Sequence, residues 1–495
     1  MATAEPEIVA VPAQLPAAPL PEAPPPPPRE IEESTGALLG KLLILAAPVL
    51  VEQVLHSFAG LADTWIANHV TPLTPTMTAT EVAAARQQMT AAGAAVGTIA
   101  YLLWFVGLIA GAVGTGSTAI IARATGARHR SLANSICGQS IGLTVIVGIV
   151  MAGIVYLGAG PIANATGLHG QAVEYARIFV RIIAAGLPFM LVLMVANACL
   201  RGAGDTVSPA VAMVVVDVVN IGVAFTLTFG WFGLPALGFK GIAIGALCGY
   251  VVGGTLQMIV LIVGRGGIRL HLHRLRPHWN NMRRLLRIGI PSGVESAVFW
   301  GVNFALIYAI NHMDASAASG AAHAVAVRIE AFSYLGGFAL AIAATTMVGQ
   351  SLGMNQPQRA ARSAYLAFAV GGAMMTVMGV VYILFGGALA RLMSEDARVI
   401  ELTTRCLFYT GFIQTFFAAA IIFSGSLRGA GDTLRVMMIN LASVVGIRLV
   451  GVLVMTRIFH ADLGDIWLLL SAEIALRGVA LIGRFAHGGW KLVKV

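Results

Sequence analysis

The sequence predicts an all-α integral membrane protein whose twelve transmembrane helices form two parallel repeats of six. Of its 495 residues, 58% are hydrophobic and only 11% are charged, which suits a bilayer better than water. A span needs about 20 mostly apolar residues, and the chain contains twelve such stretches. The hexapeptide Arg-Gly-Ala-Gly-Asp-Thr occurs twice, beginning at Arg201 and at Arg428. One half of the chain therefore repeats the other.

The twelve apolar stretches divide equally between the two halves. In the first half they lie near residues 40–67, 95–121, 136–160, 174–199, 209–229 and 241–264. In the second half they lie near residues 288–311, 321–349, 363–386, 399–427, 434–455 and 466–487. The chain also has 57 glycines and many alanines, and such small residues let helix backbones approach closely in lipid.

Two further pairs of residues show how the halves correspond. Gly126 and Gly353 each precede the arginine of their hexapeptide copy by 75 residues. The two glycines are therefore 227 positions apart, as are the two arginines. Pro48 and Pro291 are instead 243 positions apart, so the first half holds 16 extra residues between its proline and its glycine. We place this insertion in the polar stretch 69–92.

The distribution of Lys and Arg predicts the orientation. These residues gather in the loops after the even-numbered spans and in the C-terminal tail, whereas the opposite loops carry few. Because short cytoplasmic loops are enriched in Lys and Arg, we expect a multi-pass membrane protein with both termini in the cytoplasm. Each half has an even number of spans, so both halves enter the bilayer from the same side and the repeats are parallel.

The same features divide the chain into four parts. Residues 1–34 contain five consecutive prolines and an acidic cluster, and we expect a disordered cytoplasmic tail. Residues 35–264 form an N-lobe with spans one to six. Residues 265–287 form a basic cytoplasmic linker, and residues 288–495 form a C-lobe with spans seven to twelve.

Several classes of function are disfavoured by the sequence. It has no phosphate-binding Walker loop, no zinc-protease motif and no cluster of nucleophile and base, so we expect no enzyme and no cofactor. The net charge of +9 comes from arginines in short loops without interleaved aromatic residues, so we expect no nucleic-acid partner. A metal site at the linker residues His271, His273 and His278 is less favoured than a solvated basic segment, because no cysteine or carboxylate pair lies nearby.

Ionisable side chains inside the spans are the best candidates for function, because each costs about 2.5–3.5 kcal/mol at a helix centre. Glu52, His56 and Asp63 follow one stripe of the first span, which we expect to face the protein interior. Asp217 and Asn220 lie one turn apart in the fifth span. For Asp63 and Asp217 we favour a transport role, because no cation lies within a helical turn of either in the sequence.

Other polar residues of the spans are weaker candidates for the cavity or for coupling. They are Gln53, Glu295, Tyr308, His323, Arg328 and Glu330. For Arg328 with Glu330, and for Glu473 with Arg477, we favour a structural ion pair or an interfacial anchor over a transport role. The repeated hexapeptide is best explained as a helix turn, with Asp205 or Thr206 capping the next helix.

These motifs resemble the multidrug and toxic compound extrusion family, abbreviated MATE, of the MOP flippase superfamily. The resemblance rests on the two hexapeptides, on Gly-Ser-Thr-Ala-Ile-Ile-Ala-Arg-Ala-Thr-Gly ending at Gly126, on the stretch from Ala322 to Glu330, and on Ala-Ala-Thr-Thr-Met-Val-Gly-Gln-Ser-Leu-Gly ending at Gly353. The last stretch, with Arg448 and the series Glu473, Arg477, Arg484 and Trp490, looks closest to the bacterial damage-inducible protein F branch.

The resemblance implies a V-shaped pair of six-helix lobes that alternates between inward-open and outward-open states. It implies secondary active efflux of organic, often cationic, compounds in exchange for protons or sodium. The expected protein is a monomer of the plasma (bacterial inner) membrane whose partners are the bilayer and its small substrates. Asp63 matches the family's cation-coupling aspartate and Asn220 matches its fifth-span asparagine. Ala224 stands where many members have Asp or Asn, so Asp217 is the candidate substitute. A flippase of lipid-linked or other amphipathic precursors is the alternative function.

Overall fold

The computed structural model describes residues 33–71, 76–165, 168–275, 278–313 and 318–493, and in these parts it is helical. Eleven of the described helices are long and apolar enough to cross a membrane, and a bent pair brings the number to twelve. The pair is α5 (Gln171–Ala184) and α6 (Leu187–Ala203), which meet at 60° beside Pro188. The predicted all-α, twelve-span fold is confirmed.

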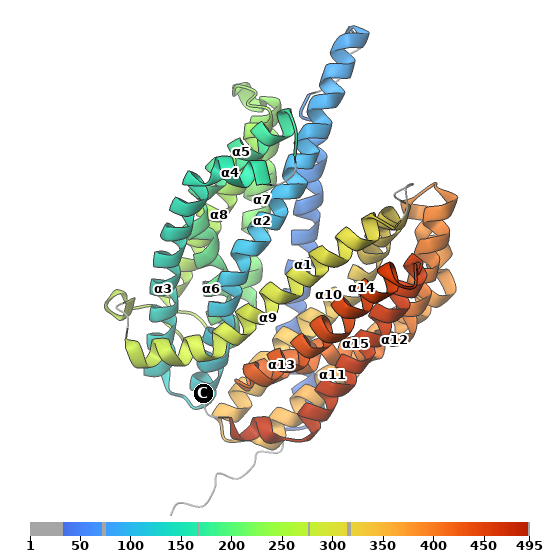
Figure 1. The fold of residues 1–495 in the computed structure, drawn as a ribbon. Coiled ribbons are helices and arrows are strands. Elements are labelled where there is room, and N and C mark those ends of the chain that lie inside the picture. Colours follow the sequence, from blue (N-terminus) through green and yellow to red (C-terminus); the bar gives the residue numbers. More distant parts are fainter. Residues whose placement is uncertain (1–32, 72–75, 166–167, 276–277, 314–317, 494–495) are drawn as a thin grey trace, which may run out of the picture.

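The helices form two lobes that diverge like the arms of a V (Figure 1). The first lobe contains α1 (Thr35–Ala67), α2 (Ala79–Gly126), α3 (Arg130–Leu157), α4 (Ala159–Ala165), α5, α6, α7 (Val207–Phe229) and α8 (Phe239–Val263). The second contains α9 (Trp279–Asn311), α10 (Ala318–Gly353), α11 (Pro357–Met393), α12 (Ala397–Gly429), α13 (Thr433–Ser443), α14 (Val450–Arg457) and α15 (Leu463–Ala486). A π-helical segment, η3 (Val444–Leu449), joins α13 to α14, and the 3-10 turns are η1 (Trp231–Gly233), η2 (Leu272–Leu275) and η4 (Gly489–Leu492).

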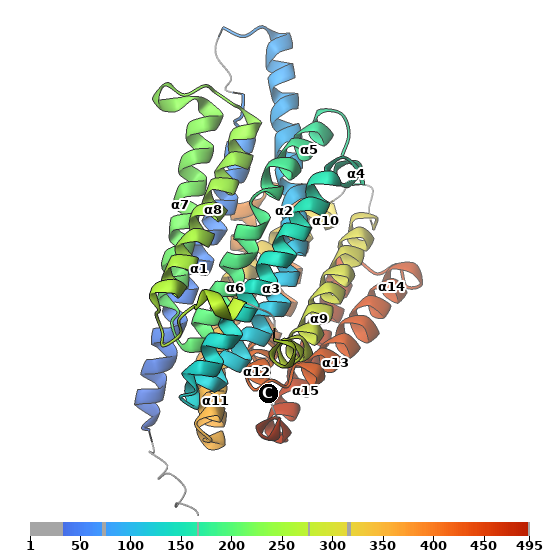
Figure 2. The same ribbon diagram turned by 90° about the vertical axis from the view of Figure 1, so that its left-hand side faces the viewer.

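Two stretches expected as connections are partly helical. The polar stretch 69–92, where we placed the insertion, contributes its last part to α2, which begins at Ala79 after a capping box formed by Thr78 and Glu81. This end of α2 projects beyond the other helices of the first lobe (Figure 2). In the interval 265–287, η2 is followed by the first turns of α9, which begins at Trp279. The expected disordered tail, except for its last two residues, lies outside the described part of the chain.

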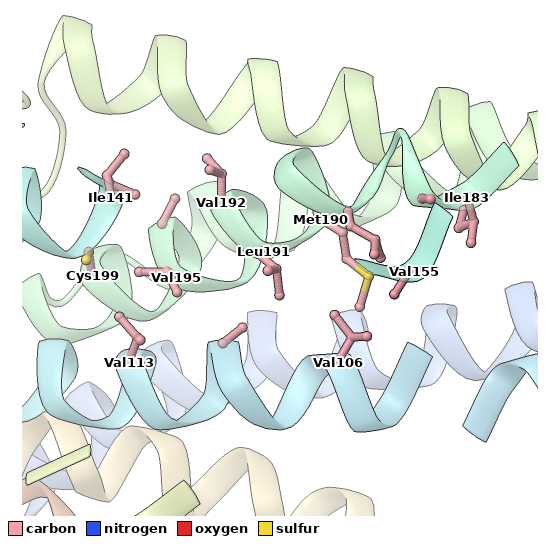
Figure 3. Packing of buried hydrophobic residues seen from close by; sticks show 14 of the residues in the cluster. Val106, Val113, Ile141, Val155, Ile183, Met190, Leu191, Val192, Val195 and Cys199 are labelled. Carbon is pink, nitrogen blue, oxygen red and sulfur yellow. The ribbon is translucent and has the colours of Figure 1, made fainter. Parts of the chain in front are cut away.

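The first lobe has a continuous apolar core. Val106 and Val113 of α2 face Leu191 and Val195 of α6, as Figure 3 shows, and all four are at most 7% exposed. Cys199 is buried in the same cluster. The core therefore fixes α2 against α6, two helices that also line the space between the lobes.

Each lobe is completed by the first helix of the other. Leu38 and Leu42, in the first half of α1, pack in a cluster of the second lobe with Met375 and Ile422. In the corresponding part of the second half, Leu285 and Ile288 of α9 pack in the core of the first lobe. Pro48 and Pro291 lie inside these two helices, where proline removes a backbone hydrogen bond. The two lobes are thus joined by reciprocal packing as well as by the linker.

The lobes touch most closely at the end that carries the start of α1 and the C-terminal η4. A Cβ atom added at Gly126 would lie 2.0 Å from the carbonyl oxygen of Gln350, and one added at Gly353 would lie 2.0 Å from that of Arg123. α2 and α10 therefore cross backbone against backbone. The Arg123 guanidinium also donates to the carbonyls of Ala430 and Val493, at 3.3 and 2.7 Å. This end of the molecule is closed.

The two hexapeptides form the turns that we expected. Gly204 and Gly431 end the preceding helices with φ of 97° and 83°, a region that glycine occupies without strain. In the first copy the Asp205 carboxylate accepts hydrogen bonds from the Ser208 backbone N–H at 2.9 Å and from its hydroxyl at 2.6 Å. In the second copy Asp432 instead pairs with Arg484 at 2.5 Å. Asp205 of the first copy confirms the predicted capping role, whereas the equivalent Asp432 of the second copy forms an ion pair.

Candidate functional sites: a central cavity and an N-lobe carboxylate cluster

A cavity of about 870 Å³ lies between the lobes, within the range of drug-binding pockets. α2 and α6 line it on one side, and α9, α10, α12, α13, η3 and α15 line it on the other. Its surface is mainly apolar. Trp104 and Trp300, from opposite lobes, meet edge to face with ring centroids 4.6 Å apart, and Phe299 lies beside them. The cavity is large and aromatic enough to hold a bulky organic molecule.

Most of the polar lining of the cavity comes from the C-lobe, including Glu295, while Arg201 contributes from the N-lobe. The Oε1 atom of Glu295 accepts hydrogen bonds from Arg428 at 2.5 Å and from Asn440 at 2.6 Å. Glu295 is only 7% exposed. A carboxylate buried in this way is stable only when it is paired. Glu295 therefore serves as the counter-ion of Arg428, the first residue of the second hexapeptide.

A second buried carboxylate, Glu473, lies behind the cavity wall. It is fully buried and accepts from Arg448 Nε at 3.0 Å, from Arg448 Nη2 at 2.5 Å and from the Ser443 hydroxyl. Arg477 approaches it less closely, with its Nε atom 3.5 Å from Glu473 Oε1. Arg448 lies in η3, and π-helical segments occur often at functional sites. The expected Glu473–Arg477 pair exists, but Arg448 is the stronger partner.

Replacing Glu473 by Ala is expected to destabilise the protein by about 3–5 kcal/mol, because it leaves Arg448 buried without its counter-ion. The measurement is the thermal unfolding of the purified protein in detergent. The matched control is Glu401→Ala, which removes a carboxylate paired at 2.9 Å with Arg398 on the surface. Exposed pairs contribute about 0–1 kcal/mol, so equal losses in the two variants would contradict the structural role of Glu473.

His323 and Glu330 line the same cavity from α10. The indole N–H of Trp467 donates to His323 Nδ1 at 3.2 Å, and because indole is only a donor, Nδ1 must accept and the imidazole carries its proton on Nε2. Glu330 accepts from the Thr410 hydroxyl at 2.7 Å. Of the two structural roles expected for Arg328 and Glu330, the ion pair does not form, because residues two apart on a helix point in different directions: Arg328 is exposed and Glu330 is buried.

A separate polar cluster lies inside the N-lobe, between α1 and α7. Asn220 donates from Nδ2 to both oxygens of the Asp63 carboxylate, at 3.2 and 3.1 Å. His56 Nδ1 lies 3.3 Å from Asp217 Oδ1. His56 comes from another helix, so a search within one helical turn of Asp217 does not find it. Tyr250 of α8 also lies close enough to Asp63 and Asp217 to interact electrostatically, and sequence reasoning did not identify it.

Two acceptor atoms of this cluster have no partner among the described residues. They are Asp217 Oδ2 and Asn220 Oδ1, and both are buried. The position of Ala224 is closed to a larger side chain, because a Cβ atom added at Gly245 would lie 2.6 Å from the Ala224 methyl group. The cluster thus presents oxygen atoms from Asp63, Asp217 and Asn220, with no room for a carboxylate at position 224.

Another predicted residue of α1, Glu52, pairs with the arginine of the first hexapeptide. Its carboxylate accepts from Arg201 Nη2 at 2.5 and 2.6 Å. Glu52 and Glu295 are 243 positions apart, as are the helix prolines, so the two lobes contain equivalent Glu–Arg pairs. This equivalence was visible in the sequence from the two repeat spacings, but we did not predict the pairing.

The structure separates the predicted site residues into groups. Glu295, His323 and Glu330 line the central cavity, whereas Asp63, Asp217 and Asn220 meet in the N-lobe cluster. Gln53, Tyr308 and Arg328 lie outside the described cavity lining, and the Tyr308 side chain is 67% exposed. The polar wall formed by Arg428, Arg448 and Arg477 was not predicted as a site.

A two-lobed helical membrane protein with a large cavity between its lobes and a carboxylate cluster inside one lobe has the architecture of a membrane transporter. The family model described as MatE matches residues 77–226 and 291–454. The chain belongs to the MATE family, whose members are transporters rather than enzymes.

Comparison with individual proteins agrees with this assignment. The chain is 27% identical to the probable multidrug resistance protein NorM of Thermotoga maritima over 93% of its own length and 95% of the relative's. It is 27% identical to multidrug resistance protein MdtK of Edwardsiella ictaluri, over 81% of this chain and 83% of the relative. A solved MOP superfamily transporter from Pyrococcus furiosus superposes with a TM-score of 0.80 at 20% identity, covering 93% of this chain and 98% of that one.

Proposed function

We propose that this protein is a secondary active multidrug efflux transporter that exchanges organic compounds for protons or sodium ions by alternating access. The observation that carries the proposal is the pairing of two separate sites: a cavity between the lobes that holds a drug-sized molecule, and an N-lobe carboxylate cluster suited to a small cation. The relatives named for multidrug resistance support export as the direction.

The closed end of the molecule supports a specific state. The arginine-rich loops and both described ends of the chain lie where α2 and α10 cross at Gly126 and Gly353. By the positive-inside rule this is the cytoplasmic end, so the conformation is closed towards the cytoplasm. Alternation requires a second conformation in which this crossing opens.

The N-lobe cluster supplies a way to couple a cation to this change. As a carboxylate, Asp63 accepts two hydrogen bonds from Asn220. When it is protonated it needs an acceptor, and rotation of the Asn220 amide presents its unpartnered Oδ1 atom. A sodium ion would instead use the oxygens of Asp63, Asp217 and Asn220 as ligands. Either ion removes the unpaired charge and changes the hydrogen bonds between α1 and α7.

The energy available is sufficient for export. One elementary charge moving down a potential of 100 mV releases about 2.3 kcal/mol, which supports roughly a fifty-fold gradient of a neutral compound exchanged for one cation. The test is uptake or release of two fluorescent dyes, one cationic and one anionic, each measured in proteoliposomes under separately imposed proton and sodium gradients. Movement driven by one gradient names the ion, and no movement under either, with inserted folded protein, contradicts the proposal and favours the flippase alternative.

A further inference from the structure

The C-lobe wall of the central cavity contains three guanidinium groups. Arg428, Arg448 and Arg477 come from α12, η3 and α15 and all line the cavity. Arg428 donates a hydrogen bond to Glu295, and Arg448 donates to Glu473 Oε2. The hydroxyl of Ser443 donates to Glu473 Oε1. Arg477 differs from the other two arginines, because it makes only a longer ion-pair contact with Glu473.

The Arg477 side chain is nine-tenths buried and has unused donors. Its side chain is 10% exposed, and the shortest distance to Glu473 is 3.5 Å, from Nε to Oε1. Among the described residues, Arg477 Nε is a buried nitrogen without a hydrogen-bond partner. A guanidinium has five N–H donors in a planar fork that matches an oxyanion. A buried polar group without partners is costly, so Arg477 is arranged to gain from a ligand that reaches the cavity.

The other carboxyl groups at this wall also accept hydrogen bonds. Glu295 Oε1 accepts from Arg428 and Asn440, whereas its buried Oε2 has no partner among the described residues, and Glu330 accepts from Thr410. Next to the arginines the wall is aromatic: the Arg448 guanidinium lies 5.6 Å from the centroid of the Phe299 ring, and Trp300 continues the surface. A ligand that satisfies both features has an oxyanion at one end and a flat apolar body at the other.

We infer that the C-lobe side of the cavity binds amphipathic anions, with Arg477 holding the carboxylate, sulfonate or phosphate group and Phe299, Trp300 and Trp104 holding the apolar body. This deepens the proposed transport function, on which it rests, by assigning the substrate class that the C-lobe selects. Cations are bound in the N-lobe at Asp63 and substrate anions in the C-lobe at Arg477, so the two lobes hold charges of opposite sign.

The test compares three ligands that share one ring system but differ in charge. Fluorescence titration of the full-length protein in phosphatidylcholine nanodiscs uses the anion dansylglycine, its neutral amide and the cationic amine dansylcadaverine, with empty nanodiscs as the background. We expect dansylglycine to bind most tightly and the amine most weakly. Equal affinities, or preference for the amine, would overturn the inference.

The variant Arg477→Gln is expected to weaken dansylglycine binding about ten- to hundred-fold, the range for a charge-assisted hydrogen bond, and to leave the amide unchanged. Arg477→Lys keeps the charge and is expected to recover part of the loss. The matched control is Arg457→Gln, which removes an exposed guanidinium at the end of α14 and should change nothing. If Arg477→Gln does not fold, the order of the affinities of the three ligands for the unaltered protein tests the inference.

The oxyanion can come from a free amphiphile or from an anionic lipid headgroup. Adding phosphatidylglycerol to the nanodiscs separates the two sources. Competition with dansylglycine identifies a lipid headgroup as an occupant, and unchanged affinity identifies a free amphiphile; both results support an oxyanion site. The proposed transport function fails independently, because it is lost only if no dye moves under either ion gradient.

Discussion

Replacing Asp63 by Asn is expected to abolish ion-driven export and to leave the protein folded in the membrane. Asn is nearly the same size as Asp but cannot gain or lose a proton or neutralise a sodium ion. Asn220 donates two hydrogen bonds to the Asp63 carboxylate, and an amide oxygen at position 63 still accepts one of them. The expected result is therefore loss of coupling, with ion-dependent dye efflux falling to the level of protein-free liposomes.

The control for this experiment removes a carboxylate elsewhere in the same lobe. Glu174 pairs with Arg177 on an exposed face of α5, at 3.0 Å. Glu174→Gln should transport dye at the unaltered rate under both gradients. If Asp63→Asn also transported dye normally, with unchanged dependence on pH and sodium, the N-lobe cluster would not be the coupling site.

Replacing Gly353 by Ala is expected to open the closed end of the molecule. The added methyl group would lie 2.0 Å from the carbonyl oxygen of Arg123, which is backbone and cannot move aside without separating α2 from α10. Overpacking costs about 1–3 kcal/mol, enough to change the ratio of two conformations by about five- to 150-fold. The variant should therefore favour the conformation open at this end and should export substrate poorly.

Distances between spin labels at Arg130 and Gln358, both exposed near the crossing, measure this shift directly. We expect longer distances in Gly353→Ala than in the labelled parent. The matched control is Gly153→Ala, because a Cβ atom there meets no other atom within 4 Å. An unchanged distance distribution in a folded Gly353 variant would show that the crossing does not determine which conformation is populated.

Most of the fold was predictable because membrane spans leave a strong local signal. The apolar stretches locate the middle of each helix, although α2, α9 and α11 begin 16, 9 and 6 residues before the predicted stretches (79 against 95, 279 against 288 and 357 against 363). The repeated hexapeptide gives the division into halves. The bend between α5 and α6 was missed, since a proline beside a glycine inside a continuous apolar stretch leaves the hydropathy unchanged. The helical start of α2 was missed because its polar residues resemble those of a loop.

The candidate sites were less predictable because they depend on contacts between distant helices. Asp63 and Asn220 stood out as polar residues in apolar spans, and the structure brings them together. The partner of Asp217, His56, lies 161 positions away, and no local pattern links the two. Arg477 was identified only as a member of an i,i+4 pair. Its unused donors become evident only once Ser443 and Arg448 are seen to occupy Glu473.

The reciprocal packing of the first helices has a consequence for biosynthesis. The core of the N-lobe includes Leu285 and Ile288, which belong to α9 and follow the last span of that lobe in the chain. During translation, the first six spans enter the membrane before the residues that complete their packing have been made. The N-lobe therefore lies in the bilayer for a time without Leu285 and Ile288 packed into its core. A nascent chain that stops after residue 264 would expose this unfilled packing surface to lipid, chaperones and membrane proteases.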